Sequence, residues 1–238
     1  MEVYLLSVEE LNSDSEAERL RELAMKNMDA VRLEKVKCLK SGETGNLAIG
    51  AGLLLQLAAR WRHMIHPGMD YGIHPRVYQG IYPACLQVSQ VIDLLDGREP
   101  VQIDYCYGEH GKPDFAEGRF HFNLSHSGQY VCCAVAEEEV GIDIQRMRPL
   151  KNTRLAERFF SQKENELLRA CGSEVERREL FYRIWVRKEA YAKLTGAGIA
   201  ATVERDVMAE PLEDVAWREF DRPEGYRVAV CSYRGTGC

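Results

Sequence analysis

A carboxylate on an apolar strand is the first feature of this sequence that suits chemistry. Residues 140–145 read Val-Gly-Ile-Asp-Ile-Gln, a short run typical of a buried strand. Residues two apart on a strand point to the same face, so Asp143 and Gln145 share one face while Ile142 and Ile144 point into the core. Such a strand by itself more often has a purely structural role.

A second carboxylate lies on a lysine-rich helical segment. One broad stripe of this helix carries Trp185, Lys188, Glu189 and Lys193. A Lys–Glu pair on a helix is usually a solvated face. If the helix packs on the strand that carries Asp143, however, two carboxylates and at least one ammonium group converge. Such a group suits a magnesium ion on a diphosphate, because Mg²⁺ prefers oxygen ligands and usually shares substrate phosphates.

A third candidate is the polar turn at residues 122–128, which read Phe-Asn-Leu-Ser-His-Ser-Gly. Ser125, His126 and the backbone N–H groups of the bend are donors that an anionic oxygen needs. The segment also fits a simple turn between two strands. A hydrolase triad is disfavoured, because the chain has no G-x-S-x-G motif and no histidine follows His126.

Composition narrows the class of protein. The chain has 238 residues, 45% hydrophobic and 29% charged, which is ordinary for a globular enzyme. A net charge of −6 gives no indication of nucleic-acid binding, so an anionic ligand needs a local basic patch. The N-terminus lacks the pattern of a signal peptide, and the apolar run at 47–59 is too short to span a membrane. We therefore expect a cytoplasmic protein whose eight cysteines are reduced.

The remaining segments predict a mixed fold. Helices are expected at 14–37, 46–64, 81–96, 152–159, 161–171 and 173–195. Strands are expected at 1–8, 101–106, 120–124, 130–136, 140–144, 201–208 and 226–233. Residues 129–135 and 225–231 have a similar pattern of apolar residues, and in each half of the chain the predicted helices precede the strands. This faint repeat indicates two similar α/β subdomains, although chance likeness of two apolar strands explains it as well.

The motifs occur in a distinctive order. Along the chain come Gly-Lys-Pro (111–113), the 122–128 turn, Gly-Ile-Asp-Ile (141–144), Arg-Phe-Phe-Ser (158–161) and Trp-x-x-Lys-Glu-Ala-x-x-Lys (185–193). This series closely resembles the 4′-phosphopantetheinyl transferases, in particular their longer, monomeric, surfactin-synthetase-activating (Sfp) type. The resemblance is specific over residues 111–196 and looser elsewhere. The shorter, trimeric holo-acyl-carrier-protein synthase type fits this length poorly.

The resemblance implies an α+β fold made of two pseudo-duplicated α/β subdomains with coenzyme A (CoA) between them. We expect residues 1–138 to form the N-terminal subdomain, with the CoA nucleotide contacts. Residues 139–238 would form the C-terminal subdomain, with the metal and the catalytic residues. The implied reaction moves the 4′-phosphopantetheine arm of CoA to a serine of an apo acyl or peptidyl carrier protein and releases 3′,5′-ADP.

The resemblance also implies roles for the residues of the two central motifs. Asp143 and Glu189 would bind Mg²⁺ on the diphosphate, and Lys193 would neutralise charge that develops on the phosphates. Glu189 is also a candidate base for the carrier serine, directly or through water, and the two roles of Glu189 stay open. Gln145 stands where many relatives have a third acidic ligand. Its amide oxygen can coordinate a metal without adding charge, and water could also fill that position.

Contacts to CoA follow from the same resemblance. Ser125 and His126 match phosphate contacts, while Lys112 and Pro113 match the region around the adenine nucleotide. The 3′-phosphate needs basic residues of the N-terminal half. Candidates there are Arg32, Lys35, Lys37 and Lys40, with Arg32 and Lys37 nearest the expected places; they could equally be cations at a helix end. Asn46 stands where many relatives place an arginine for this phosphate.

The resemblance also implies a surface that binds the carrier protein. The resemblance implies that the region after the Phe-Phe-Ser segment borders the carrier-protein site, so we expect part of residues 151–182 to dock the carrier. Basic residues that could meet an acidic carrier helix are Arg146, Arg148, Lys151, Arg154 and Arg158. The sequence does not indicate whether the carrier belongs to fatty-acid, polyketide or non-ribosomal-peptide synthesis. A decayed CoA-binding protein and a Mg²⁺-dependent hydrolase of nucleotide diphosphates are the alternatives. A metal site at His63 and His66 lacks a third ligand.

Overall fold

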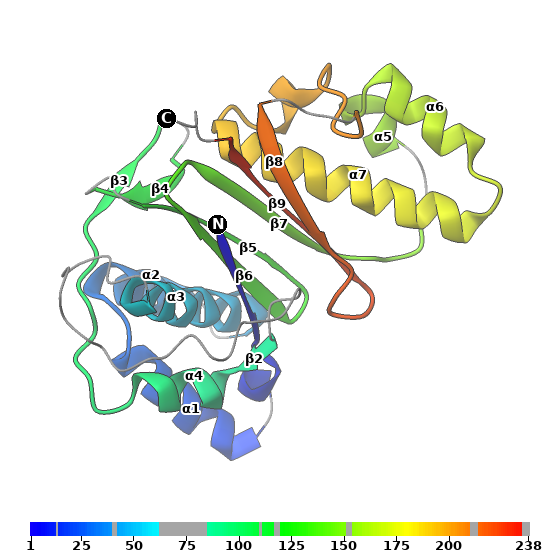
Figure 1. Ribbon diagram of the computed structural model, residues 1–238. Helices are drawn as coiled ribbons and strands as arrows, with labels where there is room; N and C mark the ends of the chain where they lie inside the picture. The colour runs from blue at the N-terminus through cyan, green and yellow to red at the C-terminus, as the bar shows by residue number, and fades with distance from the viewer. Residues whose placement is uncertain are drawn as a thin grey trace.

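Two β-sheets lie face to face between two layers of helices (Figure 1). The computed structural model describes residues 1–12, 14–39, 42–61, 85–109, 111–116, 120–150, 154–209 and 214–234. The mixture of helices with small, mainly antiparallel sheets is the α+β class predicted from the sequence. Within these residues no helix is long and apolar enough to cross a membrane.

The first half of the chain builds a four-stranded sheet of order β2-β1-β6-β5. Its strands are β1 (Glu2–Ser7), β2 (Cys85–Gln87), β5 (His121–Ser127) and β6 (Tyr130–Ala136). Helices on its outer face are α1 (Asp14–Lys26), α2 (Ala30–Cys38), α3 (Glu43–Trp61) and α4 (Val88–Leu95). The apolar run predicted as a buried helix is α3, and its leucines are fully buried against β1 and β6.

The second half builds a three-stranded sheet of order β7-β9-β8. Its strands are β7 (Val140–Arg146), β8 (Val215–Phe220) and β9 (Tyr226–Tyr233). Helices α5 (Arg154–Phe159), α6 (Gln162–Ala170) and α7 (Glu174–Thr195) follow β7 in the chain, and α7 lies along the outer face of this sheet. Short 3-10 helices, η1 (Glu9–Asn12) and η3 (Ile199–Thr202), and the small β3–β4 hairpin (Tyr105–Tyr107, Pro113–Phe115) complete the fold.

Apolar side chains fill the space between the two sheets. Val3 and Leu5 of β1 pack against Ile142 and Ile144 of β7 and Val230 of β9. The opposite face of β7 carries the side chains that meet α7. The prediction that the isoleucines point into the core and Asp143 away from it is therefore confirmed.

The edges of the two sheets meet along β5 and β7 through side chains rather than through a backbone ladder. Asn123 Oδ1 accepts the backbone N–H of Ile142 at 3.0 Å, and Ser127 Oγ accepts that of Arg146 at 3.0 Å. Ser125 Oγ, midway between them, lies 3.5 Å from the nitrogen of Ile144. Alternate residues of β5 thus satisfy the free backbone donors at the edge of β7.

Gly141 permits the close approach of α7 to β7. A Cβ atom at this position would lie 2.0 Å from the carbonyl oxygen of Ala190 and 2.5 Å from the nitrogen of Leu194. Both are backbone atoms of α7, so a side chain cannot be accommodated by rotation of a neighbour. The glycine of the Gly-Ile-Asp-Ile motif therefore sets the distance between the strand with Asp143 and the helix with Glu189.

Several element predictions were wrong in detail. The helix expected at 14–37 is two helices, because Asp29 caps α2 by accepting the N–H groups of Val31 and Arg32. Helix α4 begins at Val88, since the residues before it form β2 and pair in parallel with β1. The strand expected at 201–208 is absent, and the sequence prediction missed β8.

The expected division into subdomains stays a prediction. The chain passes from the first sheet to the second between Ala136 and Val140, which brackets the proposed boundary at residue 138. Strands β6 and β9, the source of the faint repeat, are each an interior strand of their own sheet. His63 and His66 lie outside the described residues, as do Lys40 and Lys151.

We predict that Gly141→Ala destabilises the protein by about 1–3 kcal/mol or more, because the added methyl group must push α7 away from β7. The midpoint of urea unfolding measures the loss. Gly172→Ala is the matched control, since a Cβ there would meet only the end of the Glu176 side chain at 3.4 Å. Equal midpoints for the two variants would contradict the proposed role of Gly141.

Candidate active site

Asp143 lies at the centre of the site, with a side chain that is buried among polar groups. The residue is 2% exposed. Its Oδ1 accepts hydrogen bonds from Ser125 Oγ and from Lys193 Nζ, each at 2.7 Å. Its Oδ2 accepts one from the Gln145 amide at 3.3 Å. Strand β5, strand β7 and helix α7 therefore each contribute to one polar cluster, as the sequence predicted for the strand and the helix.

The ammonium group of Lys193 is fully occupied in this cluster. It donates to Asp143 at 2.7 Å, to the hydroxyl of Ser125 at 2.8 Å and to the carbonyl of Ile142 at 3.1 Å. A lysine has three donors, so none is left over for a phosphate in this arrangement. Here Lys193 compensates the buried charge of Asp143, and contact with a phosphate requires it to exchange one of these partners.

Glu189 is the second carboxylate of the site and lies one helical turn before Lys193. Within the described parts of the chain its carboxylate has no hydrogen-bond or ion-pair partner. Burial raises the pKa of Glu189, and the negative charge of Asp143 raises it further, while Lys193 lowers it. A half-buried carboxylate that repels a neighbouring carboxylate is suited to accept either a cation or a proton.

The donor set fits an ion that takes only part of its ligands from protein. The described residues contain no group of three or more His, Cys, Asp or Glu side chains that could hold a metal. Mg²⁺ needs no such group, since it is commonly bound through one or two carboxylates together with substrate phosphates. Asp143, Glu189 and the amide oxygen of Gln145 are the residues that could hold it.

His126 and Lys35 form the basic part of the site. The His126 residue is exposed, but partial desolvation of its ring lowers its pKa, and the charges of Lys193 and Lys35 lower it further against the opposing effect of Asp143. The imidazole is therefore neutral at pH 7 and can accept or donate a hydrogen bond. Lys35 was named in the sequence only as one of four candidates. It is close enough to His126 for its charge to contribute to the lowered pKa of the imidazole.

Lys37 and Arg32, the cations preferred from the sequence, have other partners. Lys37 is exposed and pairs with Glu34 at 2.8 Å one turn earlier in α2. Arg32 is buried, and its guanidinium lies 5.4 Å from the centre of the Tyr105 ring. Their roles as CoA contacts stay predictions.

Lys112 and Pro113 lie at the β3–β4 hairpin, beside the end of α7. Lys112 Nζ donates to the carbonyl of Val140 at 3.3 Å and to that of Leu194 at 3.5 Å. Burial lowers its pKa against the attraction of nearby acidic groups. Lys112 also lines a cavity of about 430 Å³ together with Tyr107 and Gly196. An open space between the hairpin and the helix end is available there for a ligand.

Lys188 does not belong to the site, although the helical stripe grouped it with Glu189 and Lys193. Its side chain and that of Glu164 on α6 are both 0% exposed and form an ion pair at 2.9 Å. The ammonium group also donates to the carbonyls of Thr202, Val203 and Arg205. Neighbouring positions of a helix point about 100° apart, which separates Lys188 from Glu189.

Asn46 is likewise removed from phosphate chemistry. It is 2% exposed, and its amide donates to the carbonyl of Leu11 at 2.9 Å and to Asn12 Oδ1 at 2.8 Å. Its oxygen accepts from Arg21 Nε at 3.1 Å. These bonds tie α3 to η1 and α1. In this structure Asn46 therefore holds elements of the first half together, and its effect on CoA affinity stays a prediction.

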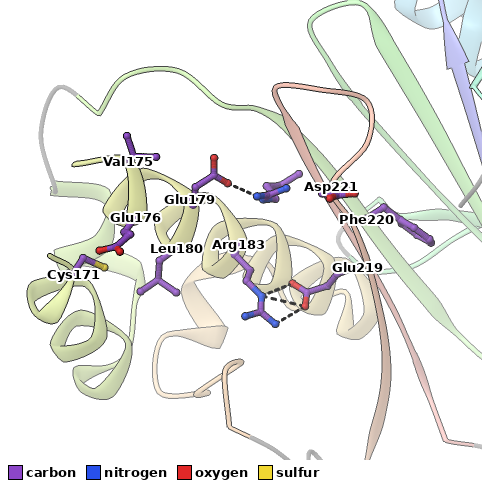
Figure 2. Close-up of a pocket in the computed structure, with 10 residues that line it drawn as sticks. Cys171, Val175, Glu176, Glu179, Leu180, Arg183, Glu219, Phe220 and Asp221 are labelled. Atoms are coloured by element: carbon purple, nitrogen blue, oxygen red, sulfur yellow. Dashed lines mark hydrogen bonds and ion pairs between the residues drawn. The ribbon is translucent and has the colours of Figure 1, made fainter. Parts of the chain in front are cut away.

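A second, larger cavity lies on the outer side of the molecule and is separate from the site. It measures about 610 Å³ and lies between the first half of α7 and the end of β8 (Figure 2). Arg183 pairs with Glu219 at 2.8 Å across it, and Arg227 pairs with Glu179. None of the residues singled out from the sequence lines this cavity.

We predict that Lys188→Met costs about 3–5 kcal/mol of folding free energy, because it leaves the carboxylate of Glu164 buried without its cation. Urea unfolding followed by circular dichroism measures this loss. Glu164→Gln combined with Lys188→Met should recover much of it, since no uncompensated charge remains. An unfolding midpoint that stays at the wild-type value in Lys188→Met would contradict the structural role.

Parts of the chain are similar to a known protein family and to curated proteins. The family model described as "4'-phosphopantetheinyl transferase superfamily" matches residues 139–231, which include Asp143, Glu189 and Lys193. The 4'-phosphopantetheinyl transferase HetI of Nostoc sp. is 42% identical over 154 residues, 59% of this chain and 65% of that protein. The 4'-phosphopantetheinyl transferase Sfp of Bacillus subtilis is 37% identical over 162 residues, 61% of this chain and 70% of that protein.

The extent of these matches differs among relatives. A putative 4'-phosphopantetheinyl transferase of Synechocystis sp. is 36% identical over 118 residues, 48% of each chain. The chain thus spans 48% to 70% of the length of these three curated relatives. The matches to Sfp and to a second Bacillus subtilis transferase, 32% identical over 68% of its length, cover most of those proteins. On this likeness the chain belongs to the 4'-phosphopantetheinyl transferase family.

Proposed function

We propose that the protein transfers the 4′-phosphopantetheine arm of CoA to a serine of an apo carrier protein, with Mg²⁺, and releases holo carrier protein and 3′,5′-ADP. The observation that supports this most directly is the pairing of two carboxylates on β7 and α7. Asp143 is compensated by Lys193, whereas Glu189 has no cation of its own among the described residues. A net negative charge in a half-buried site is suited to a divalent cation on a diphosphate.

The residues of the site divide into two groups by task. Asp143 Oδ2, Glu189 and the oxygen of the Gln145 amide would hold Mg²⁺, which when bound would neutralise negative charge on the diphosphate. His126, Lys35 and Lys112 would contact the phosphates and nucleotide of CoA, with Arg32 and Lys37 as further candidates. Orientation of the diphosphate by these groups is the main contribution that a protein makes to phosphoryl transfer.

Glu189 is suited to take the proton of the carrier serine. The serine oxygen would form a bond to the β-phosphorus of CoA while the bond from that phosphorus to the oxygen bridging to the α-phosphate breaks. The electron pair of the broken bond leaves with 3′,5′-ADP, and the hydroxyl proton moves to Glu189 directly or through water. Without a bound cation, the raised pKa makes Glu189 a stronger base than an ordinary carboxylate, so its roles as base and as ligand of Mg²⁺ are alternatives.

An exposed basic surface near α5 supports docking of an acidic carrier. Arg148, Arg154 and Arg158 are exposed there, and Leu155 is an exposed apolar residue among them. Charge complementarity of this kind accelerates encounter and fixes orientation. The pathway that the carrier serves is not encoded in these residues. The described cysteines are free thiols, which supports the proposed cytoplasmic location, and we propose that the protein acts as a monomer.

A decayed CoA-binding protein is the alternative. Gln145 in place of an acidic residue motivates it, because an amide binds Mg²⁺ less strongly than a carboxylate. The cluster around Asp143 argues against decay, since binding of CoA alone does not need a buried carboxylate next to a second one. A hydrolase of nucleotide diphosphates would cleave CoA without a carrier, which distinguishes it from both.

Incubation of the purified protein with CoA, Mg²⁺ and a panel of apo carrier proteins tests the proposal. Intact-mass spectrometry should show the gain of one phosphopantetheine on at least one carrier, and removal of Mg²⁺ with EDTA should prevent it. Glu189→Gln should lower the rate by at least about 100-fold, because it removes the negative charge that holds the cation and the group that accepts the proton. An unchanged rate in Glu189→Gln would contradict the role assigned to this carboxylate.

We predict that Arg148→Glu raises KM for the carrier about fivefold at low salt and leaves the Kd of CoA unchanged. Loss of an attractive charge contact worth about 1 kcal/mol corresponds to that factor. Steady-state kinetics with varied carrier and calorimetric titration with CoA measure the two quantities. Lys26→Glu, the same charge change on the exposed end of α1, is the control. Similar KM values for both variants would exclude Arg148 from the docking surface.

A further inference from the structure

The β3–β4 hairpin carries Lys112 and Pro113, which the family resemblance associates with the nucleotide of CoA, yet it belongs to neither large sheet. Among the described residues, β3 and β4 pair only with each other, as a separate two-stranded sheet. Lys112 ends the turn of this hairpin and Pro113 begins β4. A two-stranded hairpin alone is at best marginally stable in water, so other contacts must hold these residues in place.

The carboxylate of Asp114 joins the hairpin to β5. Its Oδ1 accepts the backbone N–H of Phe115 at 2.9 Å and that of Phe122 at 3.3 Å. Its Oδ2 accepts a hydrogen bond from Nδ1 of His121 at 2.6 Å. One side chain therefore binds a backbone group of β4 and two groups at the start of β5, where the two strands share no backbone ladder.

These bonds are partly sheltered from water. The side chain of Asp114 is 17% exposed and that of His121 is 25% exposed. On the same two strands, the Phe115 ring packs on the fully buried Phe122, with ring centroids 4.7 Å apart. Hydrogen bonds to a carboxylate are stronger than those between neutral groups, and partial burial strengthens them further. The contact is therefore suited to fix the place of the hairpin.

Asp114 lines the cavity of about 430 Å³ beside the end of α7, whereas His121 is not among the described residues that line it. Lys112 lines this cavity together with two further carboxylates, Glu109 and Glu139. The phosphates of a nucleotide are anionic, so the negative charge of Asp114 by itself would repel them. A favourable effect of Asp114 on nucleotide binding must therefore come from the position that it gives to the hairpin.

We propose that Asp114, held by His121, is a positioning residue, which fixes the β3–β4 hairpin so that Lys112 and Pro113 are preorganised for the nucleotide of CoA. This inference rests on the function proposed above, because it assumes that the hairpin contacts the nucleotide. When the conformation that binds a ligand is populated for only a fraction of the time, the affinity falls by that fraction. Loss of the Asp114 contact should therefore weaken nucleotide binding, although Lys112 and Pro113 are unchanged.

Calorimetric titration with 3′,5′-ADP tests the proposal without need of transfer activity. We expect Asp114→Ala to raise the Kd of 3′,5′-ADP about tenfold, which corresponds to a hairpin in its binding position for about a tenth of the time. His121→Ala should also raise this Kd, although His121 does not line the cavity in the described structure. Asp114→Asn should restore binding, because the amide can accept the two N–H groups and donate to Nδ1 of a neutral imidazole.

Glu10→Ala is the matched control. The carboxylate of Glu10 also accepts a backbone N–H and a side-chain donor, from the nitrogen and the Oγ of Ser89, each at 2.8 Å. Ser89 lies in α4 directly after β2, which is at the opposite edge of the four-stranded sheet from β5. The Kd of 3′,5′-ADP should therefore not change. An equal rise of this Kd in Glu10→Ala and Asp114→Ala would overturn the proposal, because it would report a general loss of stability.

Two further results would also overturn the proposal. Tighter binding of 3′,5′-ADP by both Asp114→Ala and Asp114→Asn would show that the charge of Asp114, and not its bonds, governs the affinity. Hydrogen exchange followed by mass spectrometry should be faster in β3 and β4 of Asp114→Ala than in the wild type, because the hairpin opens more often. Exchange at the wild-type rate in these strands would contradict the positioning role.

The two levels of inference remain distinguishable. If wild-type protein binds 3′,5′-ADP but modifies no carrier, the Asp114 and His121 variants still decide the positioning role while the proposed transfer fails. If wild-type protein binds no 3′,5′-ADP, the positioning role is overturned, whatever the transfer assay gives. Thermal unfolding of each variant checks that a changed Kd does not come from a protein that has lost its fold.

Discussion

The close contact between β7 and α7 is the feature on which the rest of the site depends. Gly141 allows the two backbones to approach so far that a single methyl group would collide with the helix. At that separation a lysine on α7 reaches a carboxylate on β7, and Lys193 meets Asp143 at 2.7 Å. With a larger residue at Gly141, the helix would be displaced and the carboxylates of Asp143 and Glu189 would move apart. A packing constraint thus fixes the geometry of the charged groups.

Charge in the site is only partly balanced by the protein. Asp143 is buried, and its cost in free energy is offset by the Lys193 ammonium and by hydrogen bonds from Ser125 and Gln145. Glu189 receives no comparable compensation, and burial together with the charge of Asp143 raises its pKa. One negative charge beyond what the described cations neutralise favours a divalent cation. The distribution of hydrogen bonds, rather than the number of acidic residues, gives the site this property.

Helix α7 serves two different regions of the molecule with adjacent residues. Glu189 and Lys193 face β7 and the site, whereas Lys188 is fully buried and pairs with Glu164 of α6. The second pair also holds η3 and the following residues through three backbone carbonyls. A lysine-rich motif therefore contains both a site residue and a structural anchor. The direction of each side chain, not the residue type, separates the two roles.

The sequence by itself determined the mixture of helices and strands, the alternation that turns Asp143 away from the core, and the helix that carries Glu189 and Lys193. These follow from local periodicity, which depends only on backbone geometry, whereas the α+β class followed from the resemblance to a known family. Tertiary structure alone decided that Lys188 and Asn46 are buried elsewhere, that Lys37 pairs with Glu34, and that the Ser125 hydroxyl donates to Asp143. Such partners lie far apart in the chain, and which donor meets which acceptor depends on how helices and sheets pack.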